Sequence, residues 1–486
     1  MHLFVALLLT GLFLVFLLPM GPGITPDSVA YREVALNIMQ GRGPVNHQGH
    51  FVNHWPPLYP AMLALCALLS GLDISSAAML LQGLLFFAYV WLLFRISRQC
   101  CFSPALSLFL VLVCCLLPGM FNFSRQMSEG LFNTLLLALV SVGLDAAKQP
   151  KPLLLGVLVG LLFLTRYAGM AFMAGCAAFL MFLALPDWKR MLRHFFLFGI
   201  GPATAMGGWM LLEQWMHAGH FNRKATFHPI PEQQLQSLSG LVNAQLFPPL
   251  QWIWPFSGLL MLGLFLLLSG WWMFRWRQRT ETKQFGFIWL SVCAFLALLL
   301  LTCLFLDAHT PLDARIWSPV APLLLLLLFL MLQQAPSLLR LGLPLFLLLW
   351  NLVPSAAQWN NFRKNGEGLS ARTWRTSPTL RAAAAAVQSG KAVYSNGADV
   401  LNYYWNPAGR FRIHPMPLKF YPTSGIPNPG FERESKAMMA EVQQRKAVLV
   451  YFHEIRWRKY LEDSAGIAKR LRHEKPERYP DGLMLR

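Results

Sequence analysis

Long apolar runs before residue 357 constrain the fold of this chain more than any other feature of its sequence. Twelve such runs can be recognised, at about residues 3 to 19, 57 to 70, 76 to 94, 104 to 118, 130 to 147, 152 to 165, 167 to 186, 194 to 212, 256 to 274, 285 to 306, 316 to 332 and 341 to 357. A helix needs about 20 apolar residues to cross a bilayer, where it satisfies its backbone hydrogen bonds internally. Hydrophobic residues make up 55% of the chain and charged residues only 13%, which is not the composition of a soluble globular protein. The sequence therefore predicts an all-α polytopic membrane domain at residues 1–357.

The net charge of +19 is divided between short loops and the C-terminal tail. Of the 41 Lys and Arg residues, 22 follow residue 357, together with half of the 22 acidic residues. A basic chain often binds nucleic acid. In a chain this apolar, however, Lys and Arg residues are expected in the loops at the edges of the membrane. We therefore expect membrane lipids, and no nucleic acid, among its partners.

The distribution of cations among the loops predicts the orientation. Residues 57 to 70 are short for a span and follow Pro56, so we expect an interfacial helix there and about eleven transmembrane helices elsewhere. With a cytoplasmic N-terminus, five short loops on one side carry twelve Lys and Arg residues. The longer loops on the other side carry seven, namely Arg32, Arg42, Arg125, Arg166, Arg223, Lys224 and Arg315. By the positive-inside rule, this second side is extracytoplasmic, and it receives a long first external loop, residues 20–75, and the tail.

The tail, residues 358–486, has the pattern of a small extracytoplasmic α/β domain. Ser377 and Pro378 precede TLRAAAAAVQSG, which predicts a helix with Ser377 at the N-cap and Gly390 past its end. KAVYS at residues 391–395 and AVLVYFH at residues 447–453 predict buried strands, with a helical pattern at about residues 433–445 between them.

The first external loop contains TPDSVAYREVALNIMQGRG, in which an acidic residue stands at the start of an amphipathic pattern. Asp27 can act as a general base there. Its position also fits the N-cap of a helix over residues 28–39, and the two roles are compatible. Tyr31 lies one helical turn further on, on the same face as Asp27.

Histidines gather in the same loop, at His47, His50 and His54. His54 belongs to NHWPPLYP, where a double proline fixes an extended entry into the next apolar helix. The histidine spacing matches no standard zinc pattern. We therefore expect ordinary loop residues and no metal site, with a bound divalent cation as the alternative.

Two charged residues stand at the external ends of later apolar runs. Glu129, in SRQMSEGLF, is either a catalytic acid or a first-turn acid that the helix dipole favours. Arg166, in TRY, lies between two runs that are short for full spans. We therefore expect Arg166 below the membrane surface, in a cavity.

A third charged group lies before the eleventh apolar run. In DAHTPLDARIWSPVAP, Arg315 is preceded by Asp307, His309 and Asp313. An arginine at a membrane edge is most often an interfacial anchor. Two arginines on the side that also carries Asp27 and Glu129 predict a site for an anionic, phosphate-bearing ligand.

The order of these motifs resembles that of the GT-C class of polytopic glycosyltransferases, especially the bacterial branch related to the protein O-mannosyltransferases and the lipid A aminoarabinose transferase. The resemblance covers the membrane part of the chain. It lies in PDSVAY after the first span, PPLYP closing the first loop, SEGLF in the second external loop, TRYAG, and R-x-W-x-P-x-x-P near the eleventh apolar run.

This resemblance implies an inverting glycosyltransferase at the extracytoplasmic face of a bacterial-type inner membrane. It implies a polyprenyl-phosphate sugar as the donor and a lipid, a glycan or a protein as the acceptor. Asp27 would be the catalytic base and Glu129 the second acid. Arg166 or Arg315 would hold the donor phosphate. The same motifs supply three expected substrate-binding residues, namely Tyr31, His54 and Tyr59.

Two points stay open at the level of the sequence. The first acid of such families is often paired with another acid, whereas Asp27 is followed by Ser28, so the use of a metal is undecided. The alternative functions are a multi-pass transporter and a lipid-linked glycan ligase or polymerase. A transporter often shows repeated halves, which this sequence lacks. A ligase would share the lipid-anchored donor.

Overall fold

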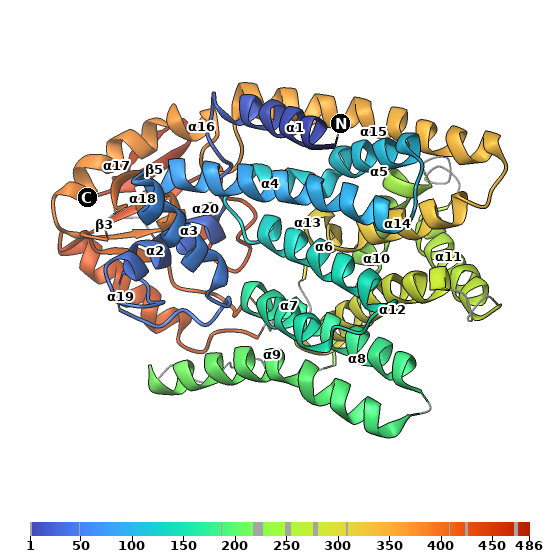
Figure 1. The fold of residues 1–486 in the computed structure, drawn as a ribbon. Helices are drawn as coiled ribbons and strands as arrows, with labels where there is room; N and C mark the ends of the chain where they lie inside the picture. The colour runs from blue at the N-terminus through green and yellow to red at the C-terminus, as the bar shows by residue number, and fades with distance from the viewer. Residues whose placement is uncertain are drawn as a thin grey trace.

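A bundle of helices forms most of the molecule, and a small sheet domain lies at one end of it (Figure 1). The computed structural model describes residues 2–47, 49–185, 187–216, 227–247, 254–275, 280–307, 310–407, 409–422, 426–470 and 475–486. Some residues used in the predictions above lie outside these stretches, namely Arg223, Lys224, Arg277, Arg279 and His309.

The described part of the membrane region contains six helices that are long and apolar enough to cross a bilayer. These are α4 (Ile74–Gln99), α6 (Glu129–Ala146), η2 with α8 (Tyr167–Gly169 and Met170–Ala184), α9 (Trp188–Trp215), α12 with η4 (Thr280–Leu301 and Thr302–Leu306) and α15 (Ser337–Asn365). Shorter apolar helices are α1 (His2–Leu17), α3 (Leu58–Ser70), α7 (Pro152–Thr165), α11 (Ser257–Arg275) and α14 (Val320–Leu332). The structure confirms a mostly helical, multi-span region, and by length it supports six or seven of the eleven predicted spans.

The run at residues 104 to 118 forms the helix α5 (Pro104–Leu116). The 3-10 helix η1 (Pro118–Ser124) follows it, and the two helices are bent by 69°. Leu117 is extended, with ψ at 142°, because a residue before proline disfavours the helical conformation. The bend brings η1 against the short helix α13 (Ala314–Trp317), which carries Arg315.

Charged residues mark the two ends of α6. Glu129 begins the helix, and Asp145 lies near its other end, about 25 Å away at 1.5 Å per residue. Asp145 accepts a hydrogen bond from Lys151 at 3.2 Å and pairs with Arg95 at 3.6 Å. Arg95 and Lys151 belong to the twelve cations that the sequence places in cytoplasmic loops. They lie at the end of α6 opposite Glu129.

Small residues allow α7 and α9 to cross closely. A Cβ atom at Gly156 would lie 2.1 Å from the carbonyl oxygen of Phe198, and one at Gly201 would lie 2.2 Å from the backbone of Gly156. Only glycine permits this approach of the two backbones. Because α7 ends at Thr165, this crossing also holds the position of Arg166, its C-cap residue.

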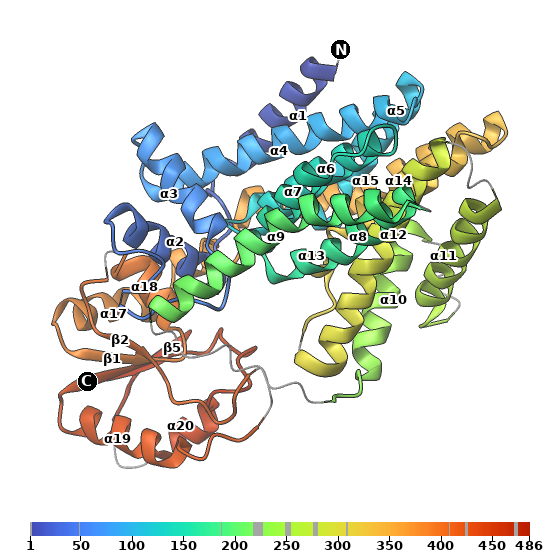
Figure 2. The ribbon, with the colours of Figure 1, turned by 60° about the horizontal axis from the view of Figure 1, so that its bottom comes forward.

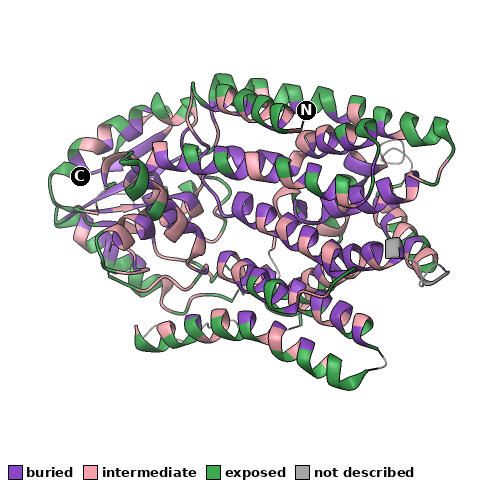
Figure 3. Ribbon diagram, in the orientation of Figure 1, coloured by how far each residue is buried: buried purple, intermediate pink, exposed green. Residues whose placement is uncertain are grey.

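Apolar side chains cover the outward faces of the peripheral helices. Figure 3 shows exposed residues along α9 and α15, whereas buried residues follow the central helices. Phe196 and Trp215 on α9, and Leu338 and Val353 on α15, are each more than 70% exposed. Such surfaces suit a lipid environment and not water.

The tail contains both helices and strands, as the sequence predicts, and its layers are α/β/α. Its five strands are β1 (Ala392–Ser395), β2 (Ile413–Pro415), β3 (Ala447–Phe452), β4 (Glu477–Tyr479) and β5 (Gly482–Leu485), in the order β2-β1-β3-β5-β4. Strand β1 is parallel to both of its neighbours, β2 and β3. Strand β5 is antiparallel to both of its neighbours, β3 and β4. Helices α17 (Pro378–Gln388) and α18 (Ala398–Trp405) cover one face, and α19 (Phe431–Gln443) and α20 (Ser464–Arg470) cover the other (Figure 2). The Ser377 hydroxyl accepts the hydrogen bond of the Leu380 amide, which confirms the predicted N-cap.

The tail joins the membrane region beside the first external loop. Helix α15 continues through residues 357 and 358 to Asn365, and the short helix α16 (Arg372–Arg375) follows. Ile24 pairs with Gly368 as an isolated parallel bridge, and Gly23 pairs likewise with Arg125. Gly368 has a φ of +61°, and a Cβ atom there would lie 2.1 Å from the Ile24 carbonyl oxygen. Glycine is therefore required where the tail holds the segment that leads to Asp27.

Candidate active site

Asp27 lies in the first turn of α2 (Pro26–Met39), but it is not the N-cap. Thr25 caps the helix, and its hydroxyl accepts a hydrogen bond from the Ser28 amide while Ser28 accepts one from the Thr25 amide. The proposed cap role of Asp27 is therefore wrong, because the preceding threonine satisfies the helix end. Asp27 is left free to contact Arg315, whose guanidinium lies 3.2 Å from its carboxylate.

Glu129 is the first residue of α6 and has a side chain that is only 3% exposed. Its carboxylate lies 2.5 Å from Nη1 of Arg166 and 3.7 Å from Nε of Arg315. Glu129 therefore occupies the favourable end of the helix dipole and also neutralises two arginines. A buried carboxylate without such partners would destabilise the fold, because its charge has lost its hydration.

The two arginines come from breaks in the helical structure. Arg166 is extended, with φ at −153°, between α7 and η2. Arg315 lies in α13, whose N-cap is Asp313, which accepts hydrogen bonds from the amides of Arg315 and Ile316. Both arginine side chains are 23% exposed.

Four elements thus bring Asp27, Glu129, Arg166 and Arg315 into one cluster. Arg315 lies between the two acids, and Glu129 lies between the two arginines. An arginine has five N–H donors, so each guanidinium can hold a carboxylate and still offer donors to an anion. The cluster suits the recognition of phosphate beside a carboxylate that can accept a proton.

Three members of this cluster line the polar part of a cavity of about 630 Å³. Glu129, Arg166 and Arg315 line that part, with Asp307 nearby. Most of the remaining wall is apolar and comes from α6, α7, α9 and α12, including Phe132, Phe163, Trp209, Phe295, Leu298 and Leu299. Arg166 therefore lines a cavity, as the sequence predicts. A ligand with an anionic head and an apolar chain would match both parts of this wall.

Asp27 lines neither this cavity nor a smaller one, but its neighbours contact both. It pairs with Arg315 of the large cavity, while the adjacent Thr25 and Pro26 line a cavity of about 270 Å³ toward the tail. One third of the Asp27 side chain is exposed. The Asp27 carboxylate is therefore accessible to an acceptor hydroxyl.

The three expected substrate-binding residues occupy different places. His54 lines the large cavity and stacks edge-on against Trp55, at a ring separation of 4.8 Å. Tyr31 and Tyr59 are buried beneath the cluster, with ring centroids 5.0 Å apart, and they do not belong to the cavity wall. Gln82 donates a hydrogen bond to the Tyr59 hydroxyl at 3.0 Å.

Tyr31 acts on the cluster through Ser128. The two hydroxyls are 3.1 Å apart, and Ser128 accepts a hydrogen bond from Nη1 of Arg166 at 3.2 Å. Burial raises the pKa of the Tyr31 phenol well above its usual range, and the nearby Arg166 offsets this only in part. The phenol stays protonated at physiological pH and positions the arginine instead of titrating.

Some residues of the site carry no signal in the sequence. Ser128 is such a residue, and so is Trp209, whose indole donates a hydrogen bond to the Tyr167 hydroxyl at 3.1 Å. Arg125 donates from Nε to Glu367 at 3.0 Å and so ties the second external segment to the tail. These contacts join residues 38 to 242 positions apart, which a search for local motifs does not detect.

The three histidines of the first loop are possible metal ligands by residue type. His47 lies 3.8 Å from the Glu33 carboxylate. In the described part of the chain, no three His, Cys, Asp or Glu side chains are grouped closely enough to hold a metal ion.

The structure is similar to solved structures of glycosyltransferases of the GT-C class. ArnT from Cupriavidus metallidurans, bound to undecaprenyl phosphate, is 14% identical with a TM-score of 0.53, and the match covers 100% of this chain and 97% of that chain. The oligosaccharyltransferase AglB from Archaeoglobus fulgidus, in complex with an inhibitory peptide and a dolichol-phosphate, is 10% identical with a TM-score of 0.53 over 93% of this chain and 69% of that chain. Another structure of the Archaeoglobus fulgidus oligosaccharyltransferase, in the apo form, gives 12% identity and a TM-score of 0.52, over 93% of this chain and 70% of that chain.

The fold and the charged cavity thus define a polytopic membrane protein with GT-C architecture. The profile of glycosyltransferase family 87 matches residues 53–302, so this chain belongs to that family. No curated protein matches the sequence significantly. The family assignment confirms the GT-C resemblance and favours a transferase over the transporter alternative.

Proposed function

We propose that this glycosyltransferase uses a polyprenyl-phosphate sugar as its donor and transfers the sugar to an acceptor hydroxyl with inversion. The observation that carries the proposal is the position of Arg166 and Arg315 at the polar end of a largely apolar cavity. A polyprenyl phosphate has an anionic head and a long apolar chain, which match the two parts of the cavity. The lipid phosphates bound by ArnT and AglB support the same donor class.

Each member of the cluster has a distinct role in this reaction. Asp27 accepts the proton of the acceptor hydroxyl, whose oxygen attacks the anomeric carbon from the face opposite the phosphate. The bond from this carbon to the phosphate oxygen breaks, and the lipid phosphate leaves as an anion. Arg315 and Arg166 stabilise that anion, and Glu129 holds both guanidinium groups in place. His54 contributes to the cavity edge beside the sugar.

The donor class can be tested with purified protein in nanodiscs. We expect transfer from a mannosyl, glucosyl or aminoarabinosyl polyprenyl phosphate, and none from the corresponding nucleotide sugars. Product formation would be followed with radiolabelled sugar and a panel of lipid, glycan and peptide acceptors. Transfer from a nucleotide sugar would contradict the proposal. Transfer of a whole oligosaccharide from a lipid pyrophosphate would instead favour the ligase alternative.

We also propose that the tail, and with it the active site, lies outside the cytoplasm of a bacterial-type inner membrane. Arg95 and Lys151 support this orientation, because they lie at the end of α6 opposite the catalytic cluster. An odd number of crossings, eleven in the sequence prediction, then places the N-terminus inside.

This topology predicts that alkaline phosphatase fused after Arg486 is active, because the enzyme folds only outside the cytoplasm. A green fluorescent protein fused at the same position should be dark when exported through the general secretory route. An inactive phosphatase fusion together with a fluorescent one would reverse the orientation.

A further inference from the structure

A second cavity, of about 510 Å³, lies in the tail at the carboxyl ends of two parallel strands. The central strand β1 has β2 on one side and β3 on the other. The chain leaves β1 through Asn396 and leaves β3 through His453, and both residues line the cavity. In open α/β sheets, ligands bind in the crevice where strand order reverses in this way.

A pair of hydrogen bonds joins the two strand ends at this crevice. The Asn396 amide donates to the Phe452 carbonyl at 2.9 Å and accepts from the Phe452 amide at 2.8 Å. A Cβ atom at Gly397 would lie 2.6 Å from the Ile455 side chain, so this position needs glycine. Asn396 therefore fixes the spacing of the two strand ends that line the cavity.

Cations outnumber acids around this cavity, because four Lys or Arg residues line it against two acidic residues, Glu462 and Asp463. Lys419, Arg456 and Lys459 line it, and within the described residues none of them forms an ion pair. Arg458 differs from these three residues because it has an acidic partner within the protein. It pairs with Asp399 at 2.9 Å and donates a hydrogen bond to the Asn396 carbonyl at 2.7 Å. The excess of positive charge at this cavity raises the local concentration of anions.

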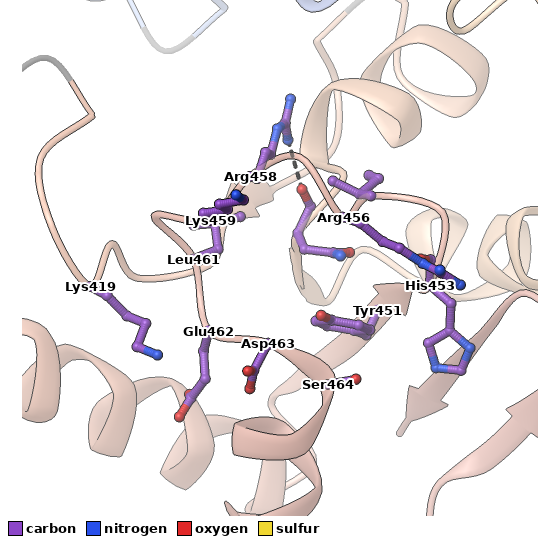
Figure 4. A pocket seen from close by; sticks show the side chains of 12 residues that line it. Lys419, Tyr451, His453, Arg456, Arg458, Lys459, Leu461, Glu462, Asp463 and Ser464 are labelled. Atoms are coloured by element: carbon purple, nitrogen blue, oxygen red, sulfur yellow. Dashed lines mark hydrogen bonds between the residues drawn. The ribbon is translucent and has the colours of Figure 1, made fainter. Parts of the chain in front are cut away.

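The wall of the cavity also offers hydrogen-bond acceptors and an aromatic ring. Figure 4 shows Lys419, Tyr451, Glu462 and Asp463 around the same space. Arg470 donates to Glu462 from one direction, and Asp463 accepts from the Gly466 amide, so both carboxylates are fixed. Their remaining lone pairs can accept hydrogen bonds from hydroxyl groups. Cations, hydroxyl acceptors and an aromatic ring together match a saccharide that carries a phosphate.

We propose that this cavity binds an anionic saccharide and that the saccharide is part of the acceptor. The assignment to the acceptor rests on the proposed function. One short segment, residues 453–459, separates the cavity from the smaller one beside Thr25 and Pro26, and Ile455 lines both. An acceptor held in the tail would therefore extend toward Asp27 from the side opposite the donor.

The test measures binding without transfer, on the full-length protein in nanodiscs of neutral lipid. Isothermal titration calorimetry with glucose 6-phosphate should give saturable binding, and glucose or inorganic phosphate alone should bind at least tenfold more weakly. The double variant Lys419→Gln, Arg456→Gln should raise the Kd by about 10- to 100-fold, since each change removes a charge-assisted hydrogen bond. Both side chains are exposed, so folding should be unaffected.

Matched variants separate this proposal from the catalytic one. Lys391→Gln removes a cation next to the other end of β1 and should leave the Kd within twofold. Asp27→Asn should also leave the Kd unchanged, so a wrong catalytic assignment would not affect this result. In transfer assays, the double variant should raise the acceptor KM while the donor KM stays constant.

Equal affinity of the parent protein and the double variant would overturn the proposal, and so would inorganic phosphate binding as tightly as glucose 6-phosphate. Nanodiscs containing anionic lipid distinguish the source of the ligand. Competition with glucose 6-phosphate there would identify a lipid headgroup as the natural saccharide carrier. If glucose 6-phosphate bound equally well in the presence of anionic lipid, the natural ligand would be a saccharide that these lipids do not carry.

Discussion

Replacing Asp27 by asparagine should lower kcat by about 10²- to 10⁴-fold, which is the contribution of a positioned general base. Asparagine has nearly the same shape as aspartate and can still accept a hydrogen bond from Arg315, which lies 3.2 Å away. The helix end is unaffected, because Thr25 and Ser28 form the cap. The loss should therefore appear in the rate of transfer and not in expression or thermal stability.

The measurement is single-turnover transfer from the lipid-linked donor at saturating donor and acceptor. Glu33→Gln is a matched control, because Glu33 lies on the same helix and pairs with His47 instead of the cluster. We expect this control to keep most of its activity. An Asp27→Asn enzyme with a similar rate would remove Asp27 from the role of base.

Arg315→Lys should raise the donor KM at least tenfold although the positive charge is kept. The Arg315 guanidinium contacts Asp27 through Nη1 and faces Glu129 through Nε, so its planar fork spans two acids at once. A lysine ammonium is a point charge that cannot serve both acids and also grip a phosphate with two parallel hydrogen bonds. Because lysine keeps the positive charge, Arg315→Lys avoids the loss of about 3–5 kcal/mol of folding stability that follows when a buried ion pair loses one partner.

Donor kinetics distinguish this role from that of an interfacial anchor. An anchor at the membrane edge would function equally well with lysine. Arg340→Lys is the matched control, since Arg340 is exposed in the first turn of α15, away from the cluster. If Arg315→Lys and Arg340→Lys both kept the donor KM of the parent enzyme, Arg315 would not be a phosphate ligand.

Local patterns in the sequence were sufficient for the membrane class, the tail helix and the identity of the charged residues. Long apolar runs specify spans because burial in lipid depends on the composition of a single segment. Ser377 specifies a helix start because its hydroxyl bonds to an amide three residues away. Glu129 and Arg166 attracted notice because an ionised group beside apolar segments needs a partner.

The tertiary structure decided how these pieces meet. Thr25 caps α2 instead of Asp27, because Thr25 and Ser28 exchange two hydrogen bonds. The Asp27 carboxylate therefore contacts Arg315, which lies 288 positions further along the chain. The bend at Pro118 and the cavity between β1 and β3 likewise depend on packing among distant segments. Hydropathy and caps act over a few residues, whereas ion pairs and cavities arise only once the chain has brought remote side chains together. For that reason the sequence alone could propose the members of the candidate active site, and only the fold could pair them.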